Sequence, residues 1–293
     1  MNADDLTTVA AARWATAPDE RLSEIMPSLV RHLHAFVRDV RLTEPEWMAA
    51  MSWLTRTGQI SDATRAEFIL ASDVLGASTL VVEMNHRHEP GATPATVLGP
   101  FHVEGSPELA YGANMADGVE GTPLYVTGAV RDATGRPVDA AVLDVWQADA
   151  DGLYESQHDG DEVRLRAKYT TRADGTYCVQ TIAPLGYSIP MDGPVGELIS
   201  RTDISPHRPA HVHFRVTAAG RRPLITHLFA RGAAYLDSDV VFGTKADLVV
   251  EFNRHPPGPT PDGGTSAVPW LSAHYDFVLQ PGSDRPHPSS EGR

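Results

Sequence analysis

RPAHVHFRV, at residues 208–216, places apolar side chains in alternation with His211 and His213. Successive side chains of a β-strand point to opposite faces, so the two imidazoles share one face and the apolar side chains share the other. The His-x-His pattern occurs three times in the chain, but only here does it lie between a proline and an alternating apolar run. The stretch therefore predicts a strand that directs two imidazoles at one point, an arrangement suited to a metal ion.

Short runs of β-forming residues follow one another from about Ala95, separated by turns rich in Gly, Pro and Asp. Asp174-Gly175 predicts a hairpin. Many short strands without intervening helices predict an antiparallel β-sandwich. The strands that we expect span residues 124–130, 141–146, 176–182, 211–216, 224–230, 246–252 and 274–279.

The first part of the chain, up to about Asn85, instead has apolar residues at helical spacing. A helix is expected to start at Thr43, which can cap it, because Glu46 can close a capping box. Gly58 is expected to end this helix, and Asp62 to cap a third one. We therefore predict a mainly β protein with a helical domain over residues 1–94, a β-sandwich domain over 95–280 and a flexible tail over 281–293.

Composition and charge exclude several classes of function. A hydrophobic content of 42% supports a packed core in a chain of 293 residues. The net charge of -14 and the absence of a basic cluster argue against nucleic-acid binding. The sequence has no apolar run of membrane-spanning length and no basic and apolar signal segment at its start. Cys178 is the single cysteine, which agrees with a reducing compartment, so we expect a cytoplasmic protein.

Tyr154 and Tyr187 lie upstream in turn-like segments and would complete a four-ligand centre with His211 and His213. A phenol has an ordinary pKa of about 10, so binding it as phenolate at neutral pH requires a strongly Lewis-acidic ion. Two phenolates balance most of the charge of a ferric ion, whereas zinc prefers Cys, His or carboxylate, and calcium prefers a larger set of oxygens. This ligand set favours Fe(III).

Two other functions fit the same residues. A zinc hydrolase would use His211 and His213 with a carboxylate such as Asp203 or Asp237 and a metal-activated water. A β-sandwich recognition module would use the histidines and tyrosines only to line a ligand surface. The zinc enzyme would be colourless and the module would bind no stoichiometric metal, whereas a phenolate bound to ferric iron absorbs visible light.

Several segments, taken in order along the chain, resemble the signatures of the intradiol ring-cleavage dioxygenases. The resemblance covers roughly residues 20–280 and includes the run that ends at His213. The matching segments are LGPFH at 98–102, VTGAV at 126–130, GRPV at 135–138, LDVW at 143–146, DGLY at 151–154, GYSIP at 186–190 and RPAHVH at 208–213.

The resemblance implies a non-haem enzyme with one Fe(III) per subunit, which cleaves a catechol-type ring between its hydroxyls and inserts both atoms of O2. Tyr187 would leave the iron when substrate binds and would accept a substrate proton. Arg208 matches an arginine beside the substrate, and His227 stands where many relatives carry a glutamine, so both become candidates for catalytic roles. The iron ligands carried over by position are Tyr154, Tyr187, His211 and His213.

The helical N-terminal part is, by the same resemblance, a dimerisation and linker domain. It joins two subunits and encloses an apolar channel that can hold phospholipid. We therefore expect a homodimer. Large apolar residues such as Phe36 and Trp47 agree with this interface, although packing against the sandwich explains the same pattern.

Within the family, residues 187–196 and 235–243 are similar to the members that cleave hydroxyquinol, benzene-1,2,4-triol, to 3-hydroxy-cis,cis-muconate, the enol form of maleylacetate. Asp73 favours this substrate, because a carboxylate in an apolar pocket can accept a hydrogen bond from the third hydroxyl. Alternatives are an exposed helical position for Asp73, and catechol or a chlorocatechol as substrate. The pocket residues that the resemblance implies are Leu70, Asp73, Val97, Leu98, Gly99, Pro100, Phe101, Ile189, Pro190, Arg208 and Val241.

Overall fold

The computed structural model divides into two compact units, Met1–Arg56 and Thr57–Arg293. Most of the predicted tail, residues 283–293, lies outside the described part of the chain, and the predicted division into three domains stays a prediction. The structure describes residues 3–62, 65–86, 90–158 and 162–282.

The first unit is helical, as the apolar spacing predicts. It contains α1 (Ala3–Trp14), α2 (Glu20–Asp39) and the first part of α3 (Glu44–Ile60). The capping box at the start of α3 is present, because the backbone N–H of Thr43 donates to Glu46 Oε2 over 2.8 Å. Gly58 does not end the helix, which continues for two more residues.

The second unit begins with the end of α3 and two further helices, where the sequence predicts one. They are α4 (Glu67–Val74) and α5 (Ala77–Asn85), and Gly76 between them has a φ of 71°. Glycine adopts this left-handed conformation at little cost, so the chain changes direction here. A short helix, α6 (Pro194–Ile199), follows later.

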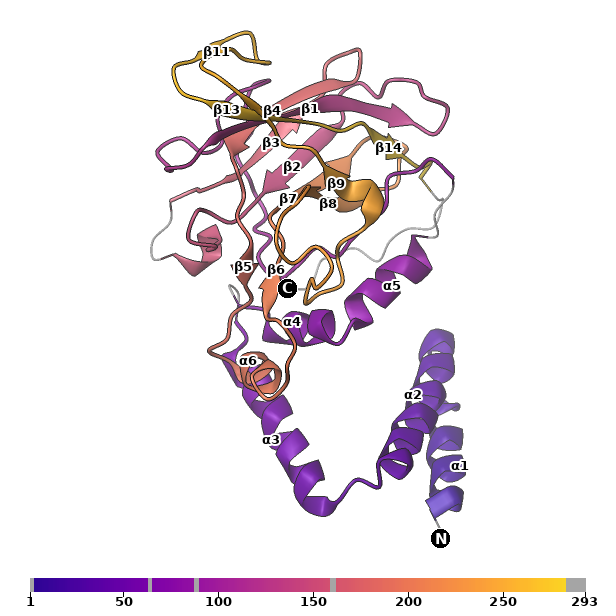
Figure 1. Ribbon diagram of the computed structural model, residues 1–293. Coiled ribbons are helices and arrows are strands. Elements are labelled where there is room, and N and C mark those ends of the chain that lie inside the picture. The colour runs from indigo at the N-terminus through magenta and orange to yellow at the C-terminus, as the bar shows by residue number, and fades with distance from the viewer. Residues whose placement is uncertain (1–2, 63–64, 87–89, 159–161, 283–293) are drawn as a thin grey trace. The chain divides into compact units, whose positions relative to one another are not determined.

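Two five-stranded sheets form the rest of the unit (Figure 1). One sheet has the order β3-β2-β7-β8-β9, and the other has the order β10-β13-β1-β14, with β4 paired to β1. The first contains β3 (Arg166–Thr170), β2 (Val142–Trp146), β7 (His211–Thr217), β8 (Leu224–Ala230) and β9 (Val249–Val250). The second contains β10 (Asn253–His255), β13 (Trp270–His274), β1 (Pro123–Asp132), β14 (Phe277–Leu279) and β4 (Thr176–Ile182). Shorter elements are η1 (Glu155–Gln157), β5 (Tyr187–Ser188), β6 (His207–Arg208), η2 (Ala246–Leu248), β11 (Gly258–Pro259) and β12 (Thr265–Ser266).

The β-sandwich is confirmed, but three details differ from expectation. The sheets are mixed, because β1 pairs in parallel with β13 and β14, and β8 pairs in parallel with β9. Asp174-Gly175 makes a turn but no hairpin, because β3 and β4 on either side of it belong to different sheets. The strand expected at residues 246–252 is mainly the 3-10 turn η2. Local sequence does not decide these features, because each depends on which distant strand pairs with the segment.

Strand β7 lies inside its sheet, between β2 and β8, and alternates as predicted. Val212, Phe214 and Val216 are fully buried in the core between the sheets. His211 and His213 therefore point to the opposite face, where loops cover them and leave each 2% exposed.

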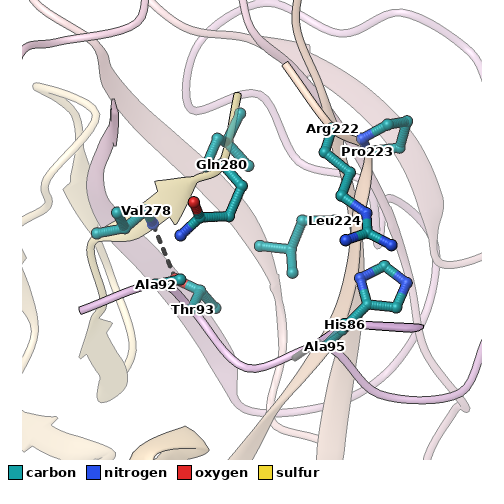
Figure 2. Close-up of a pocket in the computed structure, with 10 residues that line it drawn as sticks. His86, Ala92, Thr93, Ala95, Arg222, Pro223, Leu224, Val278 and Gln280 are labelled. Carbon is teal, nitrogen blue, oxygen red and sulfur yellow. Dashed lines mark hydrogen bonds between the residues drawn. The ribbon is translucent and has the colours of Figure 1, made fainter. Parts of the chain in front are cut away.

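A connecting segment after α5 leads to the predicted pocket turn and is fixed to both sheets. The backbone N–H of Val278 on β14 donates to Thr93 Oγ1 over 2.8 Å (Figure 2). The backbone N–H of Thr96 donates to Ile225 O on β8 over 2.8 Å. These bonds hold the segment in an extended path, so that residues 97–100 are delivered beside β7.

Candidate metal centre and substrate cavity

The two imidazoles of β7 direct their Nε2 atoms at each other, 3.1 Å apart. His211 Nδ1 donates to Pro209 O over 2.7 Å, because a carbonyl oxygen can only accept. Its Nε2 therefore carries a lone pair. His213 Nδ1 lies 2.8 Å from His227 Nε2, so its own Nε2 is also turned toward His211.

The two predicted tyrosines reach the same point from separate segments. Tyr154 Oη lies 2.9 Å from His213 Nε2, 3.4 Å from His211 Nε2 and 3.0 Å from Tyr187 Oη. Tyr154 follows a turn in which Asp149 Oδ1 accepts from two backbone N–H groups. Tyr187 is on β5, directly opposite Arg208 on β6. Four nitrogen and oxygen donors thus converge from three parts of the chain.

Burial keeps these four donors uncharged when no cation is bound. It raises the pKa of Tyr154 and of Tyr187, and it lowers the pKa of His211 to about 3 and that of His213 well below its usual value. A bound cation would instead favour the ionised form of the two phenols, because it would pair with the phenolate anions. Two hard anionic donors and two imidazoles fit a trivalent ion, so the donor chemistry of the centre agrees with ferric iron.

His227 gathers with His211 and His213, and the three imidazoles form a group that could hold a metal. The position of His227 relative to the His213 ring shows how its role differs from that of the other two histidines. Its Nε2 faces Nδ1 of His213, on the opposite side of that ring from the tyrosine oxygens. A cation held by both Nε2 atoms of β7 would therefore also meet the phenols, while His227 would support His213 from behind.

The carboxylates of a zinc hydrolase are not available at this centre. Asp203 and Asp237 are both exposed, and neither belongs to the groups of metal-binding side chains in the described part of the chain.

Gly152 allows the two tyrosines to approach, and Gly152→Ala tests this. Its φ is 80°, and an added Cβ would lie 2.6 Å from Tyr187 Cβ. We expect a loss of about 1–3 kcal/mol in unfolding free energy from backbone strain alone, and a further loss because Tyr187 is displaced. Melting temperature and visible absorbance measure the two effects. Gly135→Ala is the matched control, because its φ is 82° but nothing lies within 4 Å of the added atom. Equal losses in both variants would contradict the contact with Tyr187.

Arg208 lies beside the metal centre as one half of a buried ion pair. Its Nε donates to Asp239 Oδ1 over 3.0 Å and its Nη2 to Asp239 Oδ2 over 3.3 Å, while Nη1 lies 3.1 Å from His211 Nε2. Burial opposes the charge of Arg208, but Asp239 and the two phenols raise its pKa, so the guanidinium stays charged.

A cavity of about 880 Å³ adjoins the centre. It reaches the histidines at Gly99, where an added Cβ would lie 3.5 Å from His213 Cε1. Five of the predicted pocket residues line it, namely Asp73, Val97, Leu98, Gly99 and Pro100.

The other predicted pocket residues do not line this cavity. Phe101 stacks on Tyr154 with ring centroids 4.6 Å apart, and Arg208 is at the metal centre. Leu70, Ile189 and Val241 are buried, and Pro190 is partly exposed.

Asp73 is buried, not exposed on its helix, and Oδ1 has no hydrogen-bond partner among the described residues. The unpaired oxygen belongs to a side chain that lines the cavity together with Ser72 and Ser78. A donor from a bound molecule would satisfy it.

Asp73→Asn is expected to change how stability depends on pH. Burial raises the pKa of this carboxyl from 3.8 to about 6, although Ser78 and Arg208 oppose the shift. The protonated form is thus favoured on folding, and this contribution is complete below pH 3.8 and is lost as pH rises through about 6. Between about pH 5 and 7.5 the wild type should lose about 1 kcal/mol relative to the variant. Urea unfolding of both proteins measures this, and parallel pH profiles would contradict it.

Sequence reasoning assigned no individual role to four side chains around the centre, although each lies in a segment that matches the family. Trp146 stacks on His213 with centroids 4.7 Å apart, and His102 lies edge-on to Trp146 and within 3.3 Å of Asp144. Asp239 was seen only as part of a matching segment. The signal for Asp144 and Trp146 was their alternation on β2, whose register with β7 places Trp146 opposite His213.

Comparison with known proteins agrees with this geometry. Residues 97–281 match the family described as Dioxygenase, and residues 19–93 match the one described as Catechol dioxygenase N terminus. The chain belongs to the intradiol ring-cleavage dioxygenases. It is therefore an enzyme that acts on an aromatic diol with O2, in a family that depends on non-haem iron.

Its relatives include proteins that act on triols. A hydroxyquinol 1,2-dioxygenase of Nocardioides simplex is 49% identical over 94% of this chain and 95% of its own. A 6-chlorohydroxyquinol 1,2-dioxygenase of Cupriavidus pinatubonensis is 48% identical over 94% of this chain and 97% of its own. The solved structure of hydroxyquinol 1,2-dioxygenase from Pseudomonas putida DLL-E4 has a TM-score of 0.87 at 45% identity, covering 96% of this chain and 99% of that one.

A helix that crosses a bilayer must be about 20 residues long and mostly apolar. Within residues 3–62, 65–86, 90–158 and 162–282, no helix is long and apolar enough to span it.

Proposed function

We propose that this chain holds one ferric ion and uses O2 to cleave hydroxyquinol between two adjacent hydroxyls, giving 3-hydroxy-cis,cis-muconate or its tautomer maleylacetate. The observation that carries the proposal is the convergence of Tyr154, Tyr187, His211 and His213, whose donor atoms lie 2.9 to 3.4 Å apart along the contacts that join them. These four residues would hold the ion. When bound, it supplies positions for both substrate oxygens and draws charge from the ring, which activates the ring toward O2.

The protein's own groups prepare the substrate for this reaction. By the family resemblance, Tyr187 is the tyrosine that would move aside and accept a proton from a substrate hydroxyl, and it is on a strand of only two residues. Arg208 offers Nη1 at the centre, where a donor stabilises negative charge that develops on the ring. His227 supports the orientation of His213, because its Nε2 lies 2.8 Å from His213 Nδ1.

Asp73 supports hydroxyquinol as the substrate. It is the buried carboxylate that lines the cavity with an unpaired oxygen, and the third hydroxyl of the triol is a donor that catechol and chlorocatechols lack. The names of the relatives point to the same substrate class.

A visible spectrum of the purified protein tests the proposal. Phenolate bound to ferric iron gives a red-brown colour, and anaerobic addition of hydroxyquinol should shift the band as Tyr187 and the substrate exchange places. Oxygen uptake should then follow on admission of air, with the muconate product identified by mass. A colourless protein, or a band that substrate leaves unchanged, would refute the proposal.

We also propose that the helical first unit forms a homodimer. Leu29, Leu33 and Phe36 on α2 are each about half exposed, and such apolar faces mark interfaces. A groove of about 630 Å³ between α2 and α3 is lined by apolar side chains such as Val37, and it could hold a lipid chain. Sedimentation and mass spectrometry of the native protein test the dimer and the lipid respectively.

A further inference from the structure

Arg208 and Asp239 form an ion pair in which every polar atom of the carboxylate is used. Each carboxylate oxygen accepts from one guanidinium nitrogen and from one backbone N–H, Oδ1 from Val241 and Oδ2 from Gly243. Asp239 is thus anchored by its own loop as well as by Arg208. Gly243 packs tightly against the pair, because an added Cβ would lie 3.0 Å from Arg208 Nη2 and 3.1 Å from Asp239 Oδ2.

The pairing leaves one guanidinium nitrogen free for the centre. Arg208 Nη1 lies 3.1 Å from His211 Nε2, the atom whose lone pair a metal ion would take. A cation bound by that lone pair would displace the hydrogen bond from Arg208 Nη1. The N–H of Nη1 would then face the other ligands of the ion. The direction of this N–H is set by the two bonds on the far edge of the same planar group.

The charge of Arg208 creates a conflict that Asp239 resolves. A buried guanidinium beside the histidines repels any cation that they bind, and burial weakens the screening of this repulsion. The carboxylate of Asp239 neutralises the guanidinium from the side away from His211. The centre then has a fixed hydrogen-bond donor without a net positive charge.

We propose that Asp239 is a positioning residue that makes the Arg208 donor compatible with a trivalent ion next to it. This inference rests on the proposed function and adds a role for a residue that contacts neither the ion nor the substrate. It requires that changes at the two ends of the pair act on iron retention in opposite directions.

Three variants test the inference: Asp239→Asn, Arg208→Met and the double variant. Asp239→Asn leaves the guanidinium uncompensated, so its iron should pass to a chelator about 10–100 times faster than that of the wild type. Arg208→Met leaves an uncompensated carboxylate, so its iron should leave more slowly than that of the wild type. The double variant has neither charge and should lose iron within about threefold of the wild-type rate.

Turnover separates positioning from general damage. In Arg208→Met and in the double variant, kcat/KM should fall by about 10²–10³-fold, because the donor is gone although the iron is retained. Asp247→Asn removes one acidic charge from an exposed position and should change neither quantity. If Asp239→Asn does not fold, the double variant still decides the matter, because it must fold and keep its iron.

Iron retention in Asp239→Asn equal to that of the wild type would overturn the inference, as would loss of iron in all three variants alike. A wild-type protein without iron would overturn the proposed function itself. The two failures are therefore distinguishable from the first measurement on the wild type.

Discussion

His213→Ala is expected to reduce kcat/KM for hydroxyquinol at least about 10³-fold, because the metal contribution to catalysis is worth several kcal/mol. Its Nε2 is the atom closest to Tyr154 Oη and the partner of His211 Nε2, so its removal opens the centre on one side. The purified variant should contain little iron and should lack the visible band.

The loss should be chemical, not structural. The other face of β7 carries the fully buried Val212 and Phe214, which the substitution does not touch, so the far-ultraviolet circular dichroism should stay native. His274→Ala removes an imidazole that is 72% exposed and should retain colour and activity. A colourless His274→Ala protein, or a coloured and active His213→Ala protein, would contradict the assignment of the centre.

Asp73→Leu is expected to lower the preference for hydroxyquinol over catechol by about 10–100-fold, measured as the ratio of the two kcat/KM values. The triol loses the acceptor for its third hydroxyl. Catechol gains, because it no longer leaves a buried carboxylate unpaired. The effect comes from the Oδ1 atom that has no partner among the residues that the structure describes.

Asp73→Asn provides a graded comparison, because its amide retains an oxygen that can accept. Its preference should fall between those of the wild type and Asp73→Leu. Iron content and melting temperature of each variant show whether the site is intact. If intact Asp73→Leu keeps the wild-type ratio, another group recognises the third hydroxyl.

The alternation in residues 208–216 was sufficient to predict the orientation of β7, because one face of that strand is apolar and the period of a strand is two. The turn-like segments of the two tyrosines raised their convergence only as a hypothesis, and the family motifs supported it. Tyr154 and Tyr187 are 33 residues apart, and the Tyr154 to His213 contact spans 59 residues, so no local pattern links them.

Partners that depend on pairing between distant segments could not be predicted. The contact of His227 with His213 requires the register of β7 with β8, and the parallel pairing of β13 and β14 with β1 joins segments far apart in the chain. Asp239 was included only within the matching segment 235–243, because its ion pair with Arg208 joins residues that are 31 apart in the chain. Local preferences also failed at Gly58, where helix contacts outweighed the cost of one glycine.

The two halves of the predicted ligand set belong to backbone of different stiffness. His211 and His213 are on a seven-residue strand that is bonded along both edges, whereas Tyr187 is on a two-residue strand in a two-stranded sheet. The ligand exchange that we propose for Tyr187 would therefore take place on the tyrosine side, without loosening the sandwich.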